Sequence, residues 1–358
     1  MARCDQRLAV TSDIWDKNPF LLGTPGGVID LSTGQLARPR PEDYMTKSTT
    51  VAPAESDTPC PIFDKFLDEA TAGDPGLKRF ILQFSGYCLT GSTKEQELLF
   101  IYGPGGNGKS VLQTVVSDIL GDYAKTAPME TFAASKHQRH LTELAMLAGA
   151  RLVAVSETEK GQAWSESRVN AMTGGDKITA NFMRQDHFTY VPEFKIMVVG
   201  NNKPQIQSVN AAARRRFNII PFEHQPKEPD KMLGTKLKSE YPAILRRLID
   251  GCLDWQANGF VKPKVVLEAT REYFEEQDLF GRWLEERCEL GPNLVEKVSA
   301  LYHSWQKYAE QNGEMAQSSK VFSSMLHERG FTKHKSGVVH YQGVRLKELA
   351  EVDYSCNL

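Results

Sequence analysis

The segment "GPGGNGKS" at residues 103–110 constrains the fold of this chain more than any other feature, because it fits the pattern G-x-x-x-x-G-K-[ST] in full. It lies between the apolar run "LLFIY" (98–102) and the amphipathic stretch "SVLQTVVSDIL" (110–120). A strand, a glycine turn and a helix in that order wrap backbone N–H groups around phosphate oxygens, and the helix adds the positive end of its dipole. The sequence therefore predicts a phosphate-binding loop in an α/β fold.

Three further apolar runs predict the sheet that carries this loop. They are "RLVAV" (151–155), "KIMVV" (195–199) and "FNIIPF" (217–222). Short, nearly continuous apolar runs are typical of central parallel strands that are buried on both faces. The helix after the loop has a single apolar stripe, formed by Val111, Leu112, Val115, Val116, Ile119 and Leu120, as expected of a helix packed on a sheet. We predict an α/β fold with a central parallel sheet.

The rest of the chain is predicted to flank this sheet. Residues 1–60 are rich in turn formers and suggest small strands and loops, and residues 61–97 read as two helices. Residues 98–225 form the predicted ATPase domain, and 226–290 are mostly helical. Residues 291–358 have the pattern of two helices and a short two-stranded element, which predicts a winged-helix-like DNA-binding module.

Composition excludes some classes of protein. The 43 Lys and Arg residues almost balance 45 Asp and Glu, so the net charge of −2 excludes a strongly basic coat protein but permits local basic patches. No apolar run approaches the roughly 18 residues that a membrane helix needs, and the N-terminus lacks a signal-peptide core. The six cysteines have no metal-binding spacing, and we expect free thiols in a reducing cytoplasm.

The loop predicts a site for ATP and Mg²⁺. Lys109 would neutralise the β- and γ-phosphates, and the Ser110 hydroxyl would be a ligand of Mg²⁺. The predicted nucleotide-binding residues are Gly103, Pro104, Gly105, Gly106, Asn107, Gly108, Lys109, Ser110 and Val111.

Polar residues after two of the predicted strands are candidates for hydrolysis. Glu157 is the candidate metal carboxylate and Glu159 the candidate base that polarises water, although the two roles can be exchanged. Asn201, at the end of the third strand, can orient the attacking water. The alternatives are a pair of solvated loop acids and an ordinary asparagine turn ahead of Pro204.

The order of these motifs resembles the superfamily 3 helicases, specifically the phage and plasmid primase-helicase family that includes the poxvirus primase-helicase. The resemblance covers about residues 15–222. It rests on the phosphate loop, the strand-end acids, "MTGGDKITANFMRQDHFTYVPEF", "GNNKP" and "AAARRRFNIIPF". It implies an AAA+-like ATPase that assembles as a ring, usually a hexamer, and tracks along single-stranded and forked DNA.

The same resemblance implies a phage- or prophage-encoded protein in the cytoplasm of a bacterial host. A primase domain or a polymerase is the implied partner. Because the chain begins where the helicase half of the family begins, we expect a fragment or a stand-alone helicase without priming activity.

The resemblance also implies roles for individual residues. Gly103, Gly108, Lys109 and Ser110 match the Walker A motif, Glu157 and Glu159 the Walker B acids, and Asn201 the sensor asparagine. Arg215 and Arg216 match the position of an arginine finger. Arg215 is the first candidate and Arg216 the second, while Arg214 reads as a solvated neighbour. The chain has Asn170 and Asn181 where family members often carry basic residues, which puts individual DNA contacts in doubt.

Two basic regions are candidate DNA contacts. "KITANFM" and "HFTYV", joined by "RQD", predict a β-hairpin on which Lys177, Arg184 and His187 would grip the strand. Phe182, Phe188 and Tyr190 either stack on bases or pack within the hairpin. The C-terminal cations Lys333, His334, Lys335, Arg345 and Lys347 suit either duplex DNA or an inert basic surface. We favour a solvated loop for "SKHQRH" (135–140).

The leading hypothesis is thus an ATP-driven DNA helicase. Another phosphate-loop motor, such as a DNA-packaging or RNA-unwinding ATPase, is the alternative within the enzymes. A nucleotide-gated origin-binding or scaffold protein with low turnover is the alternative outside them.

Overall fold

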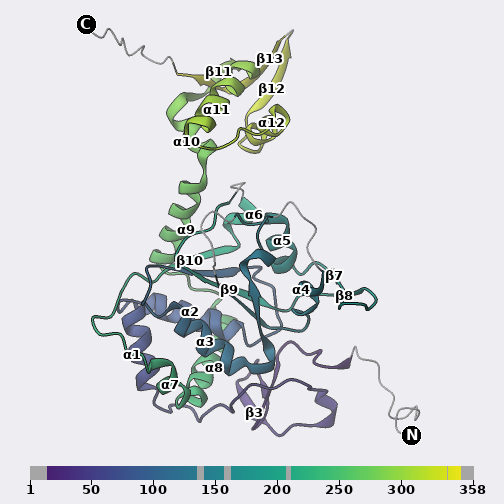
Figure 1. Ribbon diagram of the computed structural model, residues 1–358, viewed down its shortest axis with the longest axis vertical. Helices are drawn as coiled ribbons and strands as arrows, with labels where there is room; N and C mark the ends of the chain where they lie inside the picture. The colour runs from purple at the N-terminus through teal and green to yellow at the C-terminus, as the bar shows by residue number, and fades with distance from the viewer. Residues whose placement is uncertain (1–13, 135–140, 157–162, 207–210, 337, 348–358) are drawn as a thin grey trace. The chain divides into compact units, whose positions relative to one another are not determined.

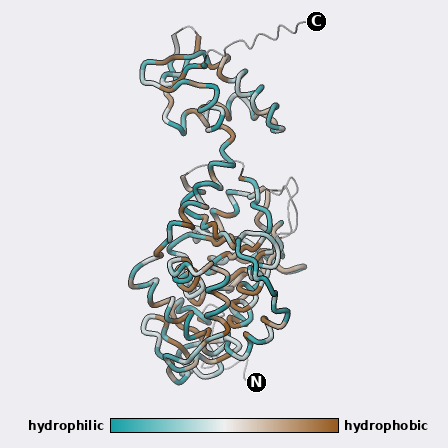
Figure 2. Tube along the Cα trace, turned by 90° about the vertical axis from the view of Figure 1, so that its left-hand side faces the viewer, coloured by the Kyte–Doolittle hydropathy of each residue, from teal (hydrophilic) through white to brown (hydrophobic). Residues whose placement is uncertain are grey.

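The computed structural model describes residues 14–134, 141–156, 163–206, 211–336 and 338–347 (Figure 1). The chain forms two compact units, Met1–Phe274 and Glu275–Leu358. Apolar stretches gather in the interior of the larger unit (Figure 2). The segments predicted at 1–60, 61–97 and 98–225 all lie in this unit, together with most of the helical segment that follows. Their boundaries as functional domains stay a prediction.

The larger unit is built on a five-stranded parallel sheet with the order β10-β4-β9-β6-β5. The strands are β4 (Leu98–Tyr102), β5 (Ala124–Pro128), β6 (Leu152–Ser156), β9 (Lys195–Gly200) and β10 (Phe217–Pro221). The predicted AAA+-like α/β fold with a central parallel sheet is confirmed. The edge strand β5 was not predicted, because "AKTAP" has no apolar run and is only partly buried.

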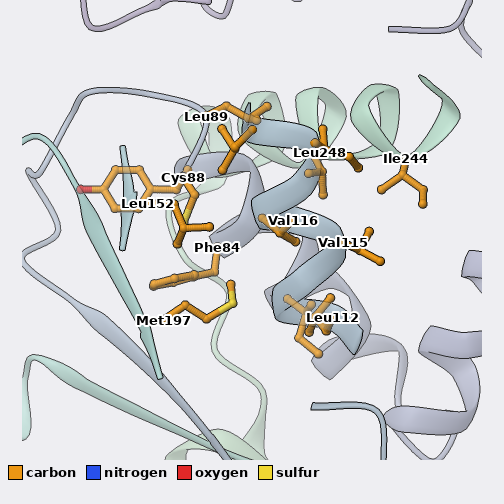
Figure 3. Close-up of a cluster of buried hydrophobic side chains, with 14 of the residues drawn as sticks. Phe84, Cys88, Leu89, Leu112, Val115, Val116, Leu152, Met197, Ile244 and Leu248 are labelled. Atoms are coloured by element: carbon orange, nitrogen blue, oxygen red, sulfur yellow. The ribbon is translucent and has the colours of Figure 1, made fainter. Parts of the chain in front are cut away.

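Helices cover both faces of the sheet. Successive strand residues point to opposite sides, and because the central strands β4, β6 and β9 are largely apolar on both sides, each face needs a covering layer. Leu99 and Ile101 face a core formed with α1 (Pro61–Ala70), α2 (Pro75–Tyr87), α3 (Lys109–Leu120) and α8 (Tyr241–Asn258). Figure 3 shows Leu112, Val115 and Val116 of α3 within this core. Leu98 and Phe100 face the opposite core, which includes residues of α5 (Glu166–Gly174) and α9 (Lys264–Gln277). The short helices are α4 (Leu141–Ala145), α6 (Ala211–Arg214) and α7 (Leu233–Lys238).

The N-terminal segment forms a small antiparallel sheet of β1 (Leu21–Thr24), β2 (Gly27–Asp30) and β3 (Gln35–Ala37). A buried cation fastens it to the parallel sheet, because Arg151 donates hydrogen bonds to the carbonyls of Leu21 and Leu89, each at 2.7 Å. Lys195 is also fully buried, and its Nζ donates to the carbonyls of Thr90, Ser92 and Glu193. Burial lowers the pKa of Lys195 to about 7. The segment predicted as strands and loops is therefore joined, through Arg151, to the amino-terminal end of β6.

The predicted hairpin is present as β7 (Ile178–Ala180) and β8 (Phe188–Tyr190), paired antiparallel. Its ladder is shorter than the sequence suggested. Residues 181–187, rather than "RQD" alone, make up the connection.

The smaller unit contains α10 (Leu279–Arg287), β11 (Cys288–Lys297), α11 (Val298–Gln311), α12 (Ser319–Glu328), β12 (Thr332–Ser336) and β13 (Val338–Leu346). Its antiparallel sheet has the order β11-β13-β12, and its own core contains Trp283, Trp305 and Phe322. Two helices followed by two strands were predicted. β11 was not, because its pairing with β13 is interrupted around "GPN" and most of its residues are exposed.

Two expectations from composition can be examined in the described residues. No helix among them is long and apolar enough to cross a membrane. Cys60, Cys88, Cys252 and Cys288 are buried free thiols. The described residues also include the short 3₁₀ helices η3 (Pro41–Asp43), η4 (Gly121–Tyr123) and η5 (Met129–Thr131).

Candidate functional site

The glycine loop takes a backbone path that other residues cannot easily follow. Gly103, Gly106 and Gly108 have φ values of 152°, 78° and 85°. A Cβ on Gly103 would lie 2.0 Å from the carbonyl oxygen of Phe222, and one on Gly108 would lie 2.6 Å from the ring of Phe66. The loop is therefore seated between the end of β10 and helix α1. Gly103 and Gly108 are required by contact as well as by φ, and Gly106 by φ alone.

The start of α3 presents its polar end beside this loop. Gly108 is the N-cap residue and has no side chain with which to cap the first-turn N–H groups. Ser110 is exposed in that first turn, and Gly105 and Gly106 lie in open surroundings. Helix starts of this kind attract phosphate groups through their backbone N–H groups and dipole. The loop is thus shaped to hold an anion.

Lys109 is held inside the curve of the loop. The side chain is buried, and its Nζ donates hydrogen bonds to the carbonyls of Gly103 at 2.7 Å and Pro104 at 3.0 Å, and to Asn107 Oδ1 at 2.9 Å. Asn107 is also buried, and its Nδ2 donates to the carbonyl of Phe222. Asn107 therefore connects the ammonium group to the end of β10.

Two glutamines hold the loop and the helix that follows it, and the sequence analysis did not identify them. Gln113 Nε2 donates to the carbonyls of Val155 at 3.1 Å and Met197 at 2.8 Å, so α3 is tied to β6 and β9. A buried polar residue in the apolar face of a helix was the signal available for it. Gln225 Nε2 donates to the carbonyl of Gly105 at 2.6 Å, and nothing in its sequence context indicates this contact.

The carboxyl edge of the sheet brings the predicted catalytic positions toward the loop. Gly200 is paired in register with Tyr102, so the exposed Asn201 follows β9 one strand away from Gly103. Lys203 Nζ lies 4.6 Å from the centre of the Tyr102 ring, at the same edge. β6 ends at this edge with Ser156, which is paired with Val199. The predicted acids Glu157 and Glu159 lie outside the described residues.

The three arginines come just before β10, at the amino-terminal ends of the strands and so opposite the phosphate loop. They differ in their surroundings. Arg216 is buried, and it donates to Thr173 Oγ1 at 3.2 Å and to the carbonyl of Ala212 at 2.8 Å. Arg214 stacks on the Phe274 ring, 5.3 Å from its centre. Arg215 is exposed. The five residues of β10 span roughly 16 Å, which separates Arg215 from the phosphate loop of its own chain.

The hairpin carries a polar and aromatic tip. Lys177, Arg184 and His187 are all exposed. The connection borders an open hollow of about 590 Å³, lined by Phe182, Arg184, Gln185, Asp186, His187 and Phe188.

The aromatic rings of the hairpin divide between the tip and its base. The Phe182 and Phe188 rings are stacked with their centres 5.6 Å apart, and Phe182 is 41% exposed. Tyr190 instead anchors the base, because its hydroxyl donates to the carbonyl of Leu144 at 2.7 Å and burial raises its pKa to about 12. Packing therefore occupies Tyr190, whereas Phe182 presents its ring at the tip.

The remaining basic positions are distributed as follows. Lys333 and His334 are exposed on β12. Arg345 is paired with Glu289 at 2.6 Å, and Lys347 donates to the carbonyl of Glu285 at 2.6 Å. The side chain of Lys335 and the segment 135–140 lie outside the described residues.

Two family models and several solved structures match the chain. Residues 1–72 match a family described as "D5 N terminal like", and residues 101–216 match a family of unknown function, DUF5906. Among solved structures, the apo form of the NrS-1 C-terminal region is 11% identical, with a TM-score of 0.49, and covers 82% of this chain and 78% of that one.

Curated relatives match most of the chain. "Putative helicase L207/L206" of Acanthamoeba polyphaga mimivirus is 26% identical over 83% of this chain and 34% of that protein. "Putative helicase 022R" of Frog virus 3 is 26% identical over 67% and 27%. "Putative primase C962R" of African swine fever virus is 24% identical over 81% and 33%. The chain spans about a third or less of the length of these relatives. The predicted resemblance is confirmed, because the chain is similar to proteins named as putative helicases and a putative primase of viruses.

Proposed function

We propose that this chain is the motor of an ATP-dependent DNA helicase that moves along single-stranded DNA. The observation that carries the proposal is the glycine loop at 103–108, which surrounds the buried side chain of Lys109. The loop lies at the start of α3 and at the carboxyl-terminal ends of the parallel strands. The relatives whose names include "helicase" support the choice of a motor over other ATP-binding proteins.

ATP and Mg²⁺ fit the residues at this edge. Backbone N–H groups of the loop would hold the phosphates, Lys109 would move from its carbonyl partners to phosphate oxygens, and the Ser110 hydroxyl would be a ligand of the metal. Glu157 and Glu159 are proposed as the metal carboxylate and the base. Asn201 would orient the water from the neighbouring strand. The bound Mg²⁺ would neutralise charge that develops on the phosphates.

The position of Arg215 supports hydrolysis at a boundary between subunits. It is exposed, and it lies at the edge of the sheet opposite the loop of its own chain. We propose that a guanidinium placed there serves a nucleotide bound to a neighbouring copy, as it would in a ring. The forked geometry and permanent charge of arginine suit the phosphoryl transition state.

The hairpin is the proposed contact with single-stranded DNA. Its tip combines the exposed Arg184 and His187 with the exposed ring of Phe182. Cations bind the backbone phosphates of any sequence, and an aromatic face can stack on any base. Such contacts are the kind a motor needs in order to step along DNA irrespective of sequence.

One experiment tests the proposal as a whole. ATP hydrolysis is measured with and without single-stranded DNA, together with separation of a forked duplex, for the wild type and Lys109→Ala. We expect single-stranded DNA to stimulate hydrolysis in the wild type, and the variant to lose both hydrolysis and unwinding. Hydrolysis that does not respond to DNA, with no strand separation, would point instead to a nucleotide-gated binding protein.

A further inference from the structure

The loop that follows β9, residues 201–206 (the β9 loop), is held by its backbone from two sides. The Tyr273 hydroxyl, on α9, donates a hydrogen bond to the carbonyl of Pro204. The backbone N–H of Trp164 donates to the carbonyl of Gln205 at 2.9 Å. Two consecutive carbonyls of the β9 loop are therefore fixed by residues from distant parts of the chain.

The same tyrosine also lies near a side chain of the β9 loop. Lys203 Nζ is 4.6 Å from the centre of the Tyr102 ring and 6.0 Å from the centre of the Tyr273 ring. Tyr102 is the last residue of β4 and directly precedes Gly103 of the phosphate loop. The contacts of Tyr273 thus hold the β9 loop directly beside the phosphate loop, and Asn201 is the first residue of the loop that is held.

Tyr273 is itself fixed in place. The residue is 0% exposed, and the centres of the Phe217 and Phe274 rings lie 6.4 Å and 5.4 Å from the centre of its ring. Nearby on α9, Thr270 Oγ1 accepts a hydrogen bond from the backbone N–H of Ile219 at 3.0 Å. Because α9 is fastened to β10 in this way, the Tyr273 hydroxyl reaches the β9 loop from a rigid support.

The hydroxyl of Tyr273 is the part that core packing does not require. A phenylalanine would fill the same space among the rings and would bring no polar group that has to be satisfied when buried. The hydroxyl adds a contact to Pro204. Since β4 lies between β10 and β9 in the sheet, a helix fastened to β10 and bonded to the β9 loop spans the strand that leads into the phosphate loop.

We propose that Tyr273 is a positioning residue for ATP hydrolysis, whose hydroxyl holds the β9 loop so that Asn201 keeps its place beside the phosphate loop. This role rests on the proposed motor function and on the part given there to Asn201, which is to orient the attacking water. Tyr273 acts through the loop and touches neither nucleotide nor water. Positions of reacting groups matter at this scale, because a displacement of about 1 Å can cost about 10²-fold in rate.

The test compares two substitutions that each remove one buried hydroxyl from the larger unit. The variant is Tyr273→Phe, which keeps the ring. The matched control is Tyr123→Phe. Tyr123 is 1% exposed, and its hydroxyl donates to the carbonyl of Lys47 at 3.1 Å and accepts from the N–H of Gly23 at 2.9 Å. It lies just before β5, at the amino-terminal ends of the strands and away from the phosphate loop.

ATP hydrolysis without DNA gives the first readout. We expect Tyr273→Phe to lower kcat about tenfold or more, while KM for ATP and Kd for ADP with Mg²⁺ stay within about threefold of the wild type. Tyr123→Phe should keep kcat within about twofold, although its midpoint of thermal unfolding should fall at least as far, since its hydroxyl makes two hydrogen bonds. An equal loss of kcat in both variants would overturn the positioning role.

A double substitution shows whether the hydroxyl acts through Asn201. In the Asn201→Ala background, Tyr273→Phe should change kcat by less than about twofold, because no side chain is left to position and the two effects are then not additive. The full tenfold loss in both backgrounds would overturn the proposal. So would an Asn201→Ala variant that hydrolyses ATP at the wild-type rate.

Hydrogen exchange in a peptide that covers the β9 loop tests the hold on the loop without turnover. Exchange should be faster in Tyr273→Phe than in the wild type or in Tyr123→Phe, and unchanged exchange would overturn the proposal. A wild-type chain that hydrolyses no ATP, with or without single-stranded DNA, would refute the motor and this role together. An active wild type whose kcat equals that of Tyr273→Phe would refute the positioning role alone.

Discussion

At the scale of single residues, Asn107 connects two parts of the candidate site. Its side chain accepts a hydrogen bond from Lys109 Nζ at 2.9 Å and donates one to the carbonyl of Phe222. Lys109 would have to reorient in order to contact a phosphate, and Asn107 holds the ammonium group at its present position. Asn107 is itself held by the carbonyl of Phe222, which follows β10, the strand that begins directly after Arg216.

We predict that Asn107→Ala lowers ATP hydrolysis about tenfold, since the loss of two buried hydrogen bonds corresponds to roughly 1–2 kcal/mol. Steady-state kinetics would measure kcat and KM separately. Gln225→Ala is the control, because it removes an exposed contact to the same loop and should change the rate less than about twofold. Equal effects of the two substitutions would show that Asn107 has no special role.

Arg215 and Arg216 are neighbours in sequence with different expected roles. Arg215→Ala should keep ATP binding and thermal stability but lower hydrolysis by about 10³–10⁵, the range found for arginine fingers that act in trans. Arg216→Ala should lower the free energy of unfolding by about 1–3 kcal/mol, because Thr173 and Ala212 lose a buried partner. Nucleotide binding, hydrolysis and thermal unfolding distinguish the two outcomes.

Mixing experiments would show whether Arg215 acts across a boundary. Arg215→Ala has an intact phosphate loop, and Lys109→Ala has an intact arginine. In mixed rings some boundaries contain one intact loop and one intact arginine, so activity should partly return. If verified mixed assemblies stay inactive, Arg215 acts within its own chain or has only a structural role.

At the scale of elements, the β7–β8 hairpin is held at its base and exposed at its tip. Tyr190 bonds to α4, whereas Arg184 and His187 are exposed in the connection. We predict that Arg184→Ala with His187→Ala weakens single-stranded DNA binding by about tenfold, makes its salt dependence shallower and spares hydrolysis measured without DNA. Lys125→Ala, which removes an exposed cation from β5, is the control. Unchanged affinity and salt slope in the hairpin variant would place the DNA contact elsewhere.

At the scale of the whole molecule, the two units have separate apolar cores. Trp283 is fully buried in the core of the smaller unit, and Trp255 in that of the larger. We predict that Trp283→Ala destabilises the smaller unit by about 3–5 kcal/mol and leaves hydrolysis without DNA near the wild-type rate. Trp255→Ala should destabilise the larger unit instead. Calorimetry should show two unfolding transitions, and each substitution should lower the midpoint temperature of one of them. A single transition, with a midpoint temperature that both substitutions lower equally, would mean that the two units unfold together.

The sequence by itself determined the elements that depend on local pattern. The phosphate loop, four of the five parallel strands, the helical stripe of α3 and the hairpin were all predicted, because glycine spacing and hydrophobic periodicity act over a few neighbouring residues. The edge strand β5 and the interrupted strand β11 were missed, since each depends on a partner distant in the sequence rather than on its own composition. The acids Glu157 and Glu159 remain sequence predictions.

Only the tertiary structure decided what each side chain of the candidate site contacts. The sequence alone shows three consecutive arginines, Arg214, Arg215 and Arg216, and gives each the same side chain. In the fold Arg216 is buried on α5, Arg214 rests on Phe274 and Arg215 is exposed. Gln113, Gln225 and Phe222 reach the site from separate parts of the chain. Packing brings these residues to their partners across long stretches of chain, and a hydrogen bond or an ion pair depends on distance in space, which local sequence does not encode.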